Sequence, residues 1–161
     1  MVENELLVQH SISFIVRQNE VLEFRIHIDQ RHSGLFYNYW SEYSLQEILA
    51  DLGFPDTGYI DIGDFETYPG FSITLIYEDQ DIYYTVYGQK QDGLVCPTFD
   101  QDIIGFIQIG IIDSGYEEGL AWIPSTYDRL FQDIFGISDQ NFYEQILLDP
   151  NICLEPHFVD P

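Results

Sequence analysis

Apolar and polar residues alternate in the first part of the chain, in a pattern that predicts a β-hairpin. In residues 11–16 and 21–28 every second position is apolar, and most of these side chains are β-branched or aromatic. The four residues between the two runs are all polar, which favours a turn. We therefore expect an antiparallel hairpin with one apolar and one polar face. Residues 34–40, with four aromatic side chains, predict a further extended segment.

The next stretch predicts an amphipathic helix over about residues 44–53. Ser44 and Glu47 have the spacing of a capping box, in which the hydroxyl binds the Glu47 amide and the carboxylate returns to the Ser44 amide. Gly53 stands where a left-handed residue ends a helix, and Pro55 prevents its continuation. The apolar stripe of this helix consists of Leu45, Ile48, Leu49 and Leu52.

The remainder of the chain predicts more strands and then two helices. The expected strands are residues 58–62, 71–77, 82–87 and 103–112, and the expected helices are residues 125–136 and 138–150. We find no linker and no apolar run near the roughly 20 residues that span a bilayer. The prediction is a single α+β domain over residues 1–161: an antiparallel sheet, a capped helix on one face, and two C-terminal helices.

The charge of the chain excludes one class of partner. The formal net charge is −23, from 28 acidic and five basic residues. Phosphate contacts require Lys and Arg, so we expect no direct binding to nucleic acid or to an anionic membrane. A basic protein partner, bound cations or simple solubility remain open as reasons for the acidity.

The sequence contains no motif that indicates catalysis or a cofactor. It has no nucleotide-binding loop, nucleophile elbow, zinc motif or Cys-x-x-Cys pair, and its four His are scattered. We therefore predict no enzyme and no cofactor. One acidic cluster gives weak calcium candidates, although its spacing differs from an EF-hand loop. These candidates are Asp56, Asp61, Asp64 and Glu66.

The two cysteines, Cys96 and Cys153, leave two interpretations open. In a cytosolic protein they would be ordinary buried thiols, whereas in an exported protein they could form a disulfide. Residues 1–10 lack the basic and apolar regions of a signal peptide. If an export signal has been removed from the natural protein, we expect an extracytoplasmic or cell-surface location, and otherwise a cytoplasmic one.

The order of several segments resembles a family of uncharacterised exported lipoproteins from Chloroflexota-type bacteria. The resemblance covers roughly residues 36–158. It rests on Trp40, Tyr43, Ser44, Leu45, Ile48, Leu49, Gly53, Pro55, Tyr77, Cys96, Pro97, Phe142, Tyr143 and Cys153. It implies a Cys96–Cys153 disulfide and a location outside the cytoplasm. This chain departs from the family in lacking the signal peptide and the lipid-bearing cysteine, and the family offers no activity that would assign catalytic residues.

A looser likeness is to BamE-like and β-lactamase-inhibitor-protein-like domains. It implies a helix packed on one face of an antiparallel sheet, with the other face free to bind a partner.

Two functional hypotheses follow, from different classes of protein. The first is a non-enzymatic extracytoplasmic binding or scaffold module, with surface aromatic side chains for a protein or carbohydrate partner. Its candidate binding residues are Tyr37, Tyr39, Trp40, Tyr83 and Tyr87. The alternative is that these rings pack in the core, and for alternating strand residues the pattern favours this alternative. The second is an acidic inhibitor or immunity-type protein that imitates nucleic-acid charge and blocks a basic partner. An enzyme with a glycosidase-like carboxylate pair ranks third, because nothing in the sequence indicates one.

Overall fold

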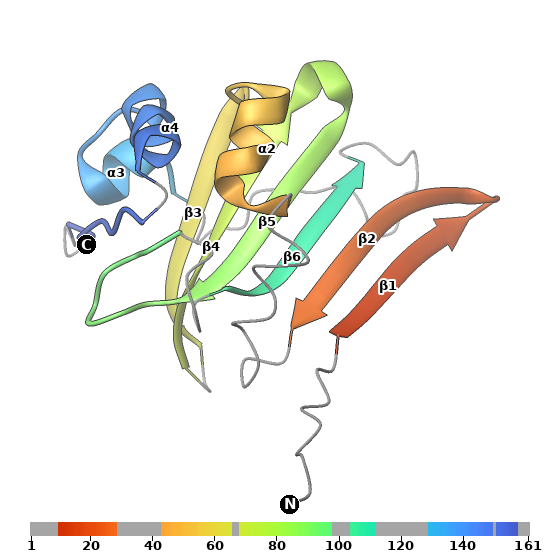
Figure 1. The fold of residues 1–161 in the computed structure, drawn as a ribbon, viewed down its shortest axis with the longest axis horizontal. Helices are drawn as coiled ribbons and strands as arrows, with labels where there is room; N and C mark the ends of the chain where they lie inside the picture. Colours follow the sequence, from red (N-terminus) through yellow and green to blue (C-terminus); the bar gives the residue numbers. More distant parts are fainter. Residues whose placement is uncertain are drawn as a thin grey trace, which may run out of the picture.

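The fold is a six-stranded antiparallel sheet with helices on one face, in a computed structural model that describes residues 10–28, 43–65, 68–97, 104–111, 129–149 and 151–157 (Figure 1). The strand order is β1-β2-β6-β5-β4-β3. The strands are β1 (His10–Arg17), β2 (Glu20–Ile28), β3 (Thr57–Phe65), β4 (Tyr68–Tyr77), β5 (Ile82–Gln89) and β6 (Ile104–Ile111). The helices are α2 (Leu45–Leu52), α3 (Phe131–Phe135) and α4 (Asp139–Leu148), with a 3-10 turn η3 (Glu78–Gln80). The predicted α+β class is confirmed.

The N-terminal hairpin forms as predicted. Arg17 pairs with Glu20, so the turn has two residues, and both of them, Gln18 and Asn19, have positive φ angles (50° and 70°). Positive φ at both positions matches the right-handed twist of the strands that such a turn joins. Leu22 is an extra residue in β2 and forms a bulge there. The extended segment predicted for residues 34–40 lies outside the described residues.

Helix α2 is capped as the sequence indicates, with one difference. The Ser44 hydroxyl accepts the Glu47 N–H at 3.1 Å, and Gly53, with φ 82°, donates its N–H to the Leu49 carbonyl at 3.1 Å. Within the described residues, the Glu47 carboxylate makes no return bond to the Ser44 amide, because this exposed side chain remains in solvent. The capping box is therefore half formed.

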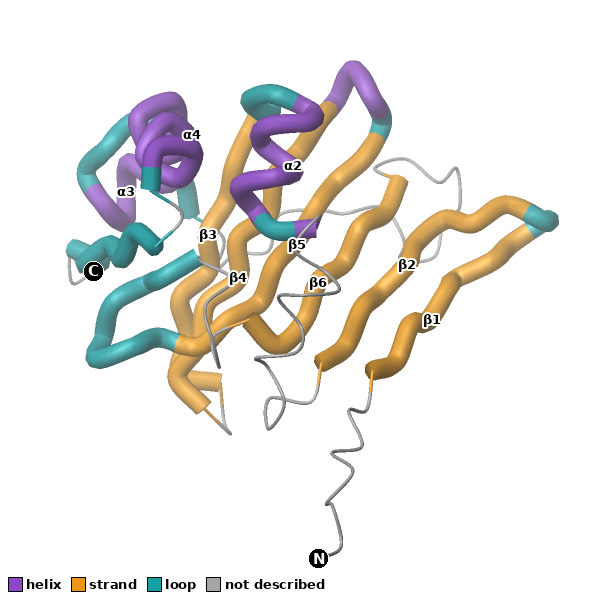
Figure 2. The backbone as a smooth tube through the Cα atoms, viewed as in Figure 1, coloured by secondary structure: helices purple, strands orange, loops and turns teal. Residues whose placement is uncertain are grey.

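The core lies between the helices and one face of the β3–β6 part of the sheet (Figure 2). Its centre is a row of aliphatic residues that are directly opposite one another on four neighbouring strands. None of these side chains is exposed to solvent. Their burial and their contacts with cross-strand neighbours stabilise the sheet. The row consists of Ile60, Ile73, Val86 and Ile107.

The first C-terminal helix begins later than predicted. Its described part starts at Phe131, and no side chain caps it at Leu130. The reason is that Arg129 is extended and pairs with Ile60 of β3 through two backbone hydrogen bonds of 2.8 Å. The cap predicted near residue 125 lies outside the described residues. Helix α3 ends at Gly136 as predicted, and α4 begins at the predicted Ser138 cap, which accepts the Asn141 N–H at 3.3 Å.

Stacked aromatic rings join α3 and α4 to the core. The Phe131 and Phe142 rings stack with centroids 4.0 Å apart, and the Tyr143 ring meets Phe131 edge-on at 5.8 Å. These are the geometries that aromatic pairs prefer. The two short helices thus form one unit with the β3 side of the sheet.

Candidate functional site

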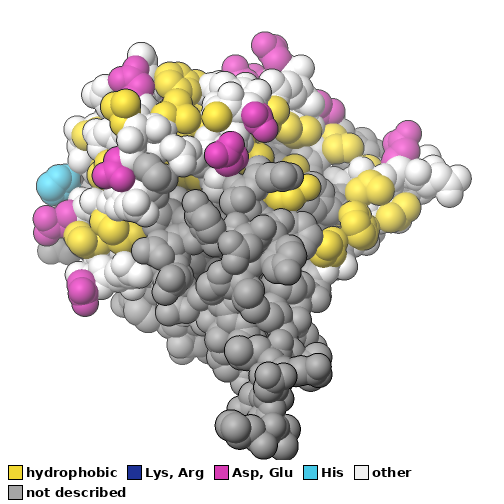
Figure 3. Space-filling view, in the orientation of Figure 1, with side chains coloured by type: hydrophobic (Ala, Val, Ile, Leu, Met, Phe, Trp, Pro, Cys, Tyr) yellow, Lys and Arg dark blue, Asp and Glu magenta, His cyan; other side chains and the backbone are white. Residues whose placement is uncertain are grey.

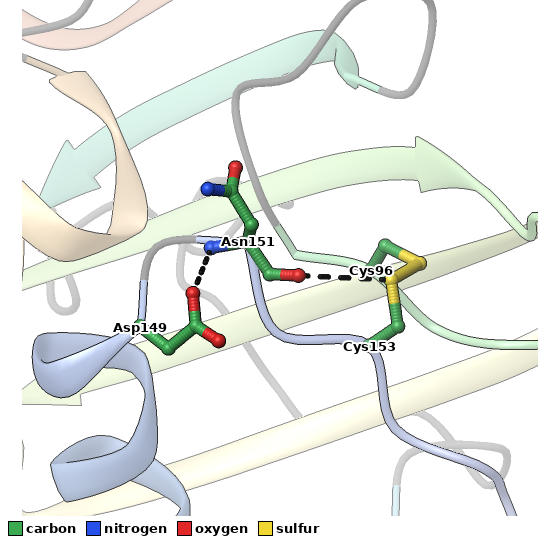
Figure 4. Close-up of a disulfide and its surroundings, with 4 residues drawn as sticks. All are labelled: Cys96, Asp149, Asn151 and Cys153. Carbon is green, nitrogen blue, oxygen red and sulfur yellow. Dashed lines mark hydrogen bonds between the residues drawn. A yellow bond between two sulfur atoms is a disulfide. The ribbon is translucent and has the colours of Figure 1, made fainter.

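A disulfide joins the loop after β5 to the chain after α4 (Figure 4). Cys96 and Cys153 are bonded at an S–S distance of 2.12 Å, with their Cα atoms 4.2 Å apart. Cys96 is completely buried, whereas Cys153 is exposed. The pairing implied by the lipoprotein resemblance is confirmed, and the interpretation as free buried thiols is wrong.

Hydrogen bonds hold the C-terminal segment on both sides of the disulfide. Val95 and Leu154 form a two-bond antiparallel bridge, and the His157 N–H binds the Ile134 carbonyl at 2.7 Å. Asp149 accepts the Asn151 N–H at 2.9 Å (Figure 4). The 4.0 Å approach of Cys153 Sγ to the Asn151 carbonyl in the same view is a contact, because a disulfide sulfur carries no proton to donate. The segment 151–157 is therefore fixed to the domain.

The sheet face opposite α2 is not the free surface that the looser likeness implied. At its centre Ser72, Thr74 and Thr85 are buried, and the two threonine hydroxyls hydrogen-bond to each other at 2.9 Å. A free binding face would expose these side chains. The prediction of an open second face is wrong over β4 and β5.

The aromatic residues proposed as a binding surface do not form one within the part of the chain that the structure describes. Tyr83 is buried: its ring lies against Gly110, where a Cβ atom would meet it at 2.6 Å, and its hydroxyl accepts the Gln108 amide at 2.7 Å. Tyr83 is thus a packing residue, and its assignment to a binding surface is wrong. Tyr87 is half-buried. Tyr37, Tyr39 and Trp40 lie outside the described residues.

Among the described residues, the calcium candidates are not gathered into a site. In the part of the chain that the structure describes, no group of three or more His, Cys, Asp or Glu side chains could hold a metal. Asp56 accepts the Glu78 N–H at 2.8 Å, which orders the turn after β4. Asp61 and Asp64 follow along β3, and Glu66 lies outside the described residues.

Large apolar side chains are exposed along the edge strand β1. Ile12, Phe14 and Val16, which we call the β1 apolar row, are 46 %, 60 % and 57 % exposed, and Val21 of β2 extends the row at 52 %. Figure 3 shows hydrophobic side chains on the surface over this hairpin. The alternation of the sequence predicted this apolar face but not that it is exposed. It stays exposed because the described helices cover the β3–β5 half of the sheet (Figure 1).

Acidic side chains gather where α2 ends and β4 turns into β5. The group, which we call the η3 acidic end, is exposed throughout and consists of Asp51, Asp56, Glu78, Asp79 and Asp81. The chain has no Lys or Arg between Arg31 and Lys90. On the face in Figure 3 the carboxylates are separated by neutral and apolar atoms.

Two buried tyrosine hydroxyls in the core behave differently. The Tyr84 hydroxyl donates to the Tyr43 carbonyl at 2.8 Å, whereas the Tyr143 hydroxyl has no hydrogen-bond partner among the described residues. Burial raises the pKa of both hydroxyls far above the usual tyrosine range. Both therefore stay protonated and neutral, with no role in charge balance.

Comparison of the chain with protein-family models, with curated proteins and with solved structures found no match. Within the described residues, none of the helices has the length and apolar character needed to cross a membrane.

Proposed function

We propose that this protein is a non-enzymatic binding or scaffold module that works outside the cytoplasm and docks a protein on the edge strand β1. The observation that carries the proposal is the exposed β1 apolar row. Three large apolar side chains in one line, on a strand with a single described neighbour, form a surface suited to another protein.

The edge position strengthens this interpretation. Folded proteins commonly protect edge strands with charged side chains, Pro or a covering loop, because an open edge invites pairing. In β1 the single charged residue is Arg17, at the end of the strand, and the row itself is apolar. No described residue of the chain protects this edge, which is consistent with selection for binding.

The disulfide supports the proposed location outside the cytoplasm. Disulfides persist in oxidising compartments and are rare in the reducing cytosol. The buried Cys96 sulfur is bonded rather than free, and the bond fixes the C-terminal segment. An exported protein uses such a bond structurally, which agrees with the exported lipoproteins that the chain resembles.

The test is a binding experiment with matched apolar-to-charged variants. The wild-type protein, Phe14→Lys and Leu148→Lys would be immobilised and exposed to the extracytoplasmic fraction of the source cells and to the protein itself. Leu148 is the control because it is 84 % exposed and lies on α4, away from β1. We expect wild type and Leu148→Lys to retain a partner that Phe14→Lys loses. Equal retention by all three, or none by wild type, would contradict the proposal.

The second candidate function is an acidic inhibitor of a basic protein, and the η3 acidic end favours it. Its test is binding to a basic nuclease at increasing salt, with Asp79→Asn/Asp81→Asn as the variant and Glu144→Gln as the control. Binding to the nuclease should weaken with added salt and with the double substitution, because the attraction is between exposed charges. Binding that persists undiminished at high salt would exclude this candidate.

A further inference from the structure

We propose that the partner of β1 is the β1 strand of a second copy, paired antiparallel to form a two-fold symmetric dimer with one continuous sheet. This inference rests on the proposed function, because it names the occupant of the same edge. Four observations carry it: the sequence pattern of the strand, its local charge, its exposure and the state of the opposite sheet edge.

The pattern of β1 is self-complementary. If Phe14 faces Phe14 of the second copy, Ile12 faces Val16 and Val16 faces Ile12, so each side chain of the row gains an apolar cross-strand neighbour on the same face. A shift by one residue would put the two rows on opposite faces of the joined sheet. A shift by two residues toward the strand start would place Val16 opposite His10. The Phe14-centred register is therefore the one in which every residue of the row pairs with another residue of the row.

Charge explains why two highly acidic molecules can meet at this place. The whole chain carries −23, which opposes contact between copies over most of the surface. The hairpin of residues 10–28 contains two Glu and two Arg, so its formal net charge is zero. The β1 edge thus combines exposed apolar area with an absence of local like-charge repulsion.

The opposite edge of the sheet explains why pairing closes at two copies. β3 is the other edge strand, but Ile60 of β3 already exchanges two hydrogen bonds with Arg129, and α3 packs beside it. Head-to-tail pairing of β1 with β3 of the next copy would produce an open fibre, and this bridge obstructs it. Pairing of β1 with β1 leaves no further open edge among the described strands.

The first measurement is sedimentation equilibrium of the oxidised wild-type protein, Phe14→Lys and Leu148→Lys over a range of protein and salt concentrations. We expect a monomer–dimer equilibrium for wild type and Leu148→Lys that tightens with added salt, because salt screens the repulsion between two −23 chains. Phe14→Lys should raise the dissociation constant on the order of a hundredfold or more, since it removes two central apolar side chains and adds two charges.

A cysteine substitution tests the register. Both natural cysteines are already bonded, so Phe14→Cys adds the single free thiol of the chain. Opposed residues of paired strands lie about 4.5–5.5 Å apart at Cα, within disulfide range. Mild oxidation should yield a covalent dimer with Phe14→Cys but not with the control Val21→Cys, because Val21 lies on the inner strand β2. Peptide mapping would confirm that Cys96–Cys153 is intact.

The outcomes separate this inference from the proposed function. Circular dichroism and thermal melting first establish that each variant is folded. A wild-type monomer at all concentrations and salts would overturn the dimer, and so would a dimer unaffected by Phe14→Lys. If that monomer still retains a different protein through Phe14, the proposed function stands alone. If it retains none, both fail.

Discussion

The Tyr143 hydroxyl lies in the aromatic cluster of α3 and α4 without a hydrogen-bond partner among the described residues. A buried polar group without a partner loses its hydration and gains nothing in return. This hydroxyl therefore opposes the folding that the rest of its ring favours.

Removing this hydroxyl should not destabilise the protein. We expect Tyr143→Phe to leave the free energy of unfolding unchanged or to raise it by up to about 1 kcal/mol. Tyr84→Phe is the matched control and should lower it by about 1 kcal/mol, because the Tyr84 hydroxyl is bonded to the Tyr43 carbonyl. Urea denaturation of both variants measures the difference. A larger loss with Tyr143→Phe than with Tyr84→Phe would show that the hydroxyl has a stabilising role.

Gly58 gives the aromatic cluster its space on β3. A Cβ atom there would overlap the Phe131 ring and the Tyr143 hydroxyl. We expect Gly58→Ala to lower the free energy of unfolding by about 2 kcal/mol through overpacking. The double variant Gly58→Ala/Tyr143→Phe should recover part of this loss, because one of the two overlapping groups is gone. Simple additivity of the two changes would contradict the contact.

For single residues, the sequence indicates which side chains share a face of a strand or helix, but not whether that face is buried. The strand predicted over residues 82–87 places Tyr83 and Tyr87 on one side, because successive side chains of a strand point to opposite faces. Alternation has the same form whether that side meets solvent or protein, so the sequence favoured core packing for Tyr83 but could not establish it. The caps at Ser44 and Ser138 were predictable because they depend on residues within one helical turn.

Among the elements, the C-terminal segment depends most on a single bond. The two cysteines are 57 residues apart in sequence, and opening such a loop costs about 4 kcal/mol of stability in the chain-entropy model. We expect reduction to lower the denaturant concentration at which the protein unfolds. Reduction should also speed hydrogen exchange at the His157 amide more than at amides of β4. Equal exchange at His157 before and after reduction would show that backbone hydrogen bonds alone hold the segment.

Element boundaries that depend on local signals were predicted well, and boundaries that depend on distant partners were not. The hairpin and α2 carry their turn and cap residues within the segment itself. The late start of α3 depends on the bridge between Arg129 and Ile60, which are far apart in sequence. The exposure of the β1 apolar row likewise depends on how far the helices extend over the sheet, which no local pattern encodes.

For the whole molecule, the net charge of −23 is a source of self-repulsion. We expect the melting temperature to rise with sodium chloride, because screening reduces the repulsion in the compact state more than in the expanded chain. Replacing exposed acids of the η3 acidic end, as in Asp79→Asn/Asp81→Asn, should reduce this salt dependence. Differential scanning calorimetry at two salt concentrations measures it, and a melting temperature independent of salt would contradict the expectation.

The position of the disulfide also determines what a protease could do to this protein. A single cut of the backbone anywhere between Cys96 and Cys153 would leave both fragments covalently linked. The strands before the cut and helix α4 or its remainder would stay attached, and the nicked molecule would migrate as one species until a reductant separates it. In the extracytoplasmic location proposed above, where proteases are common and reductants scarce, this bond would keep the domain covalently joined after a cut in its chain.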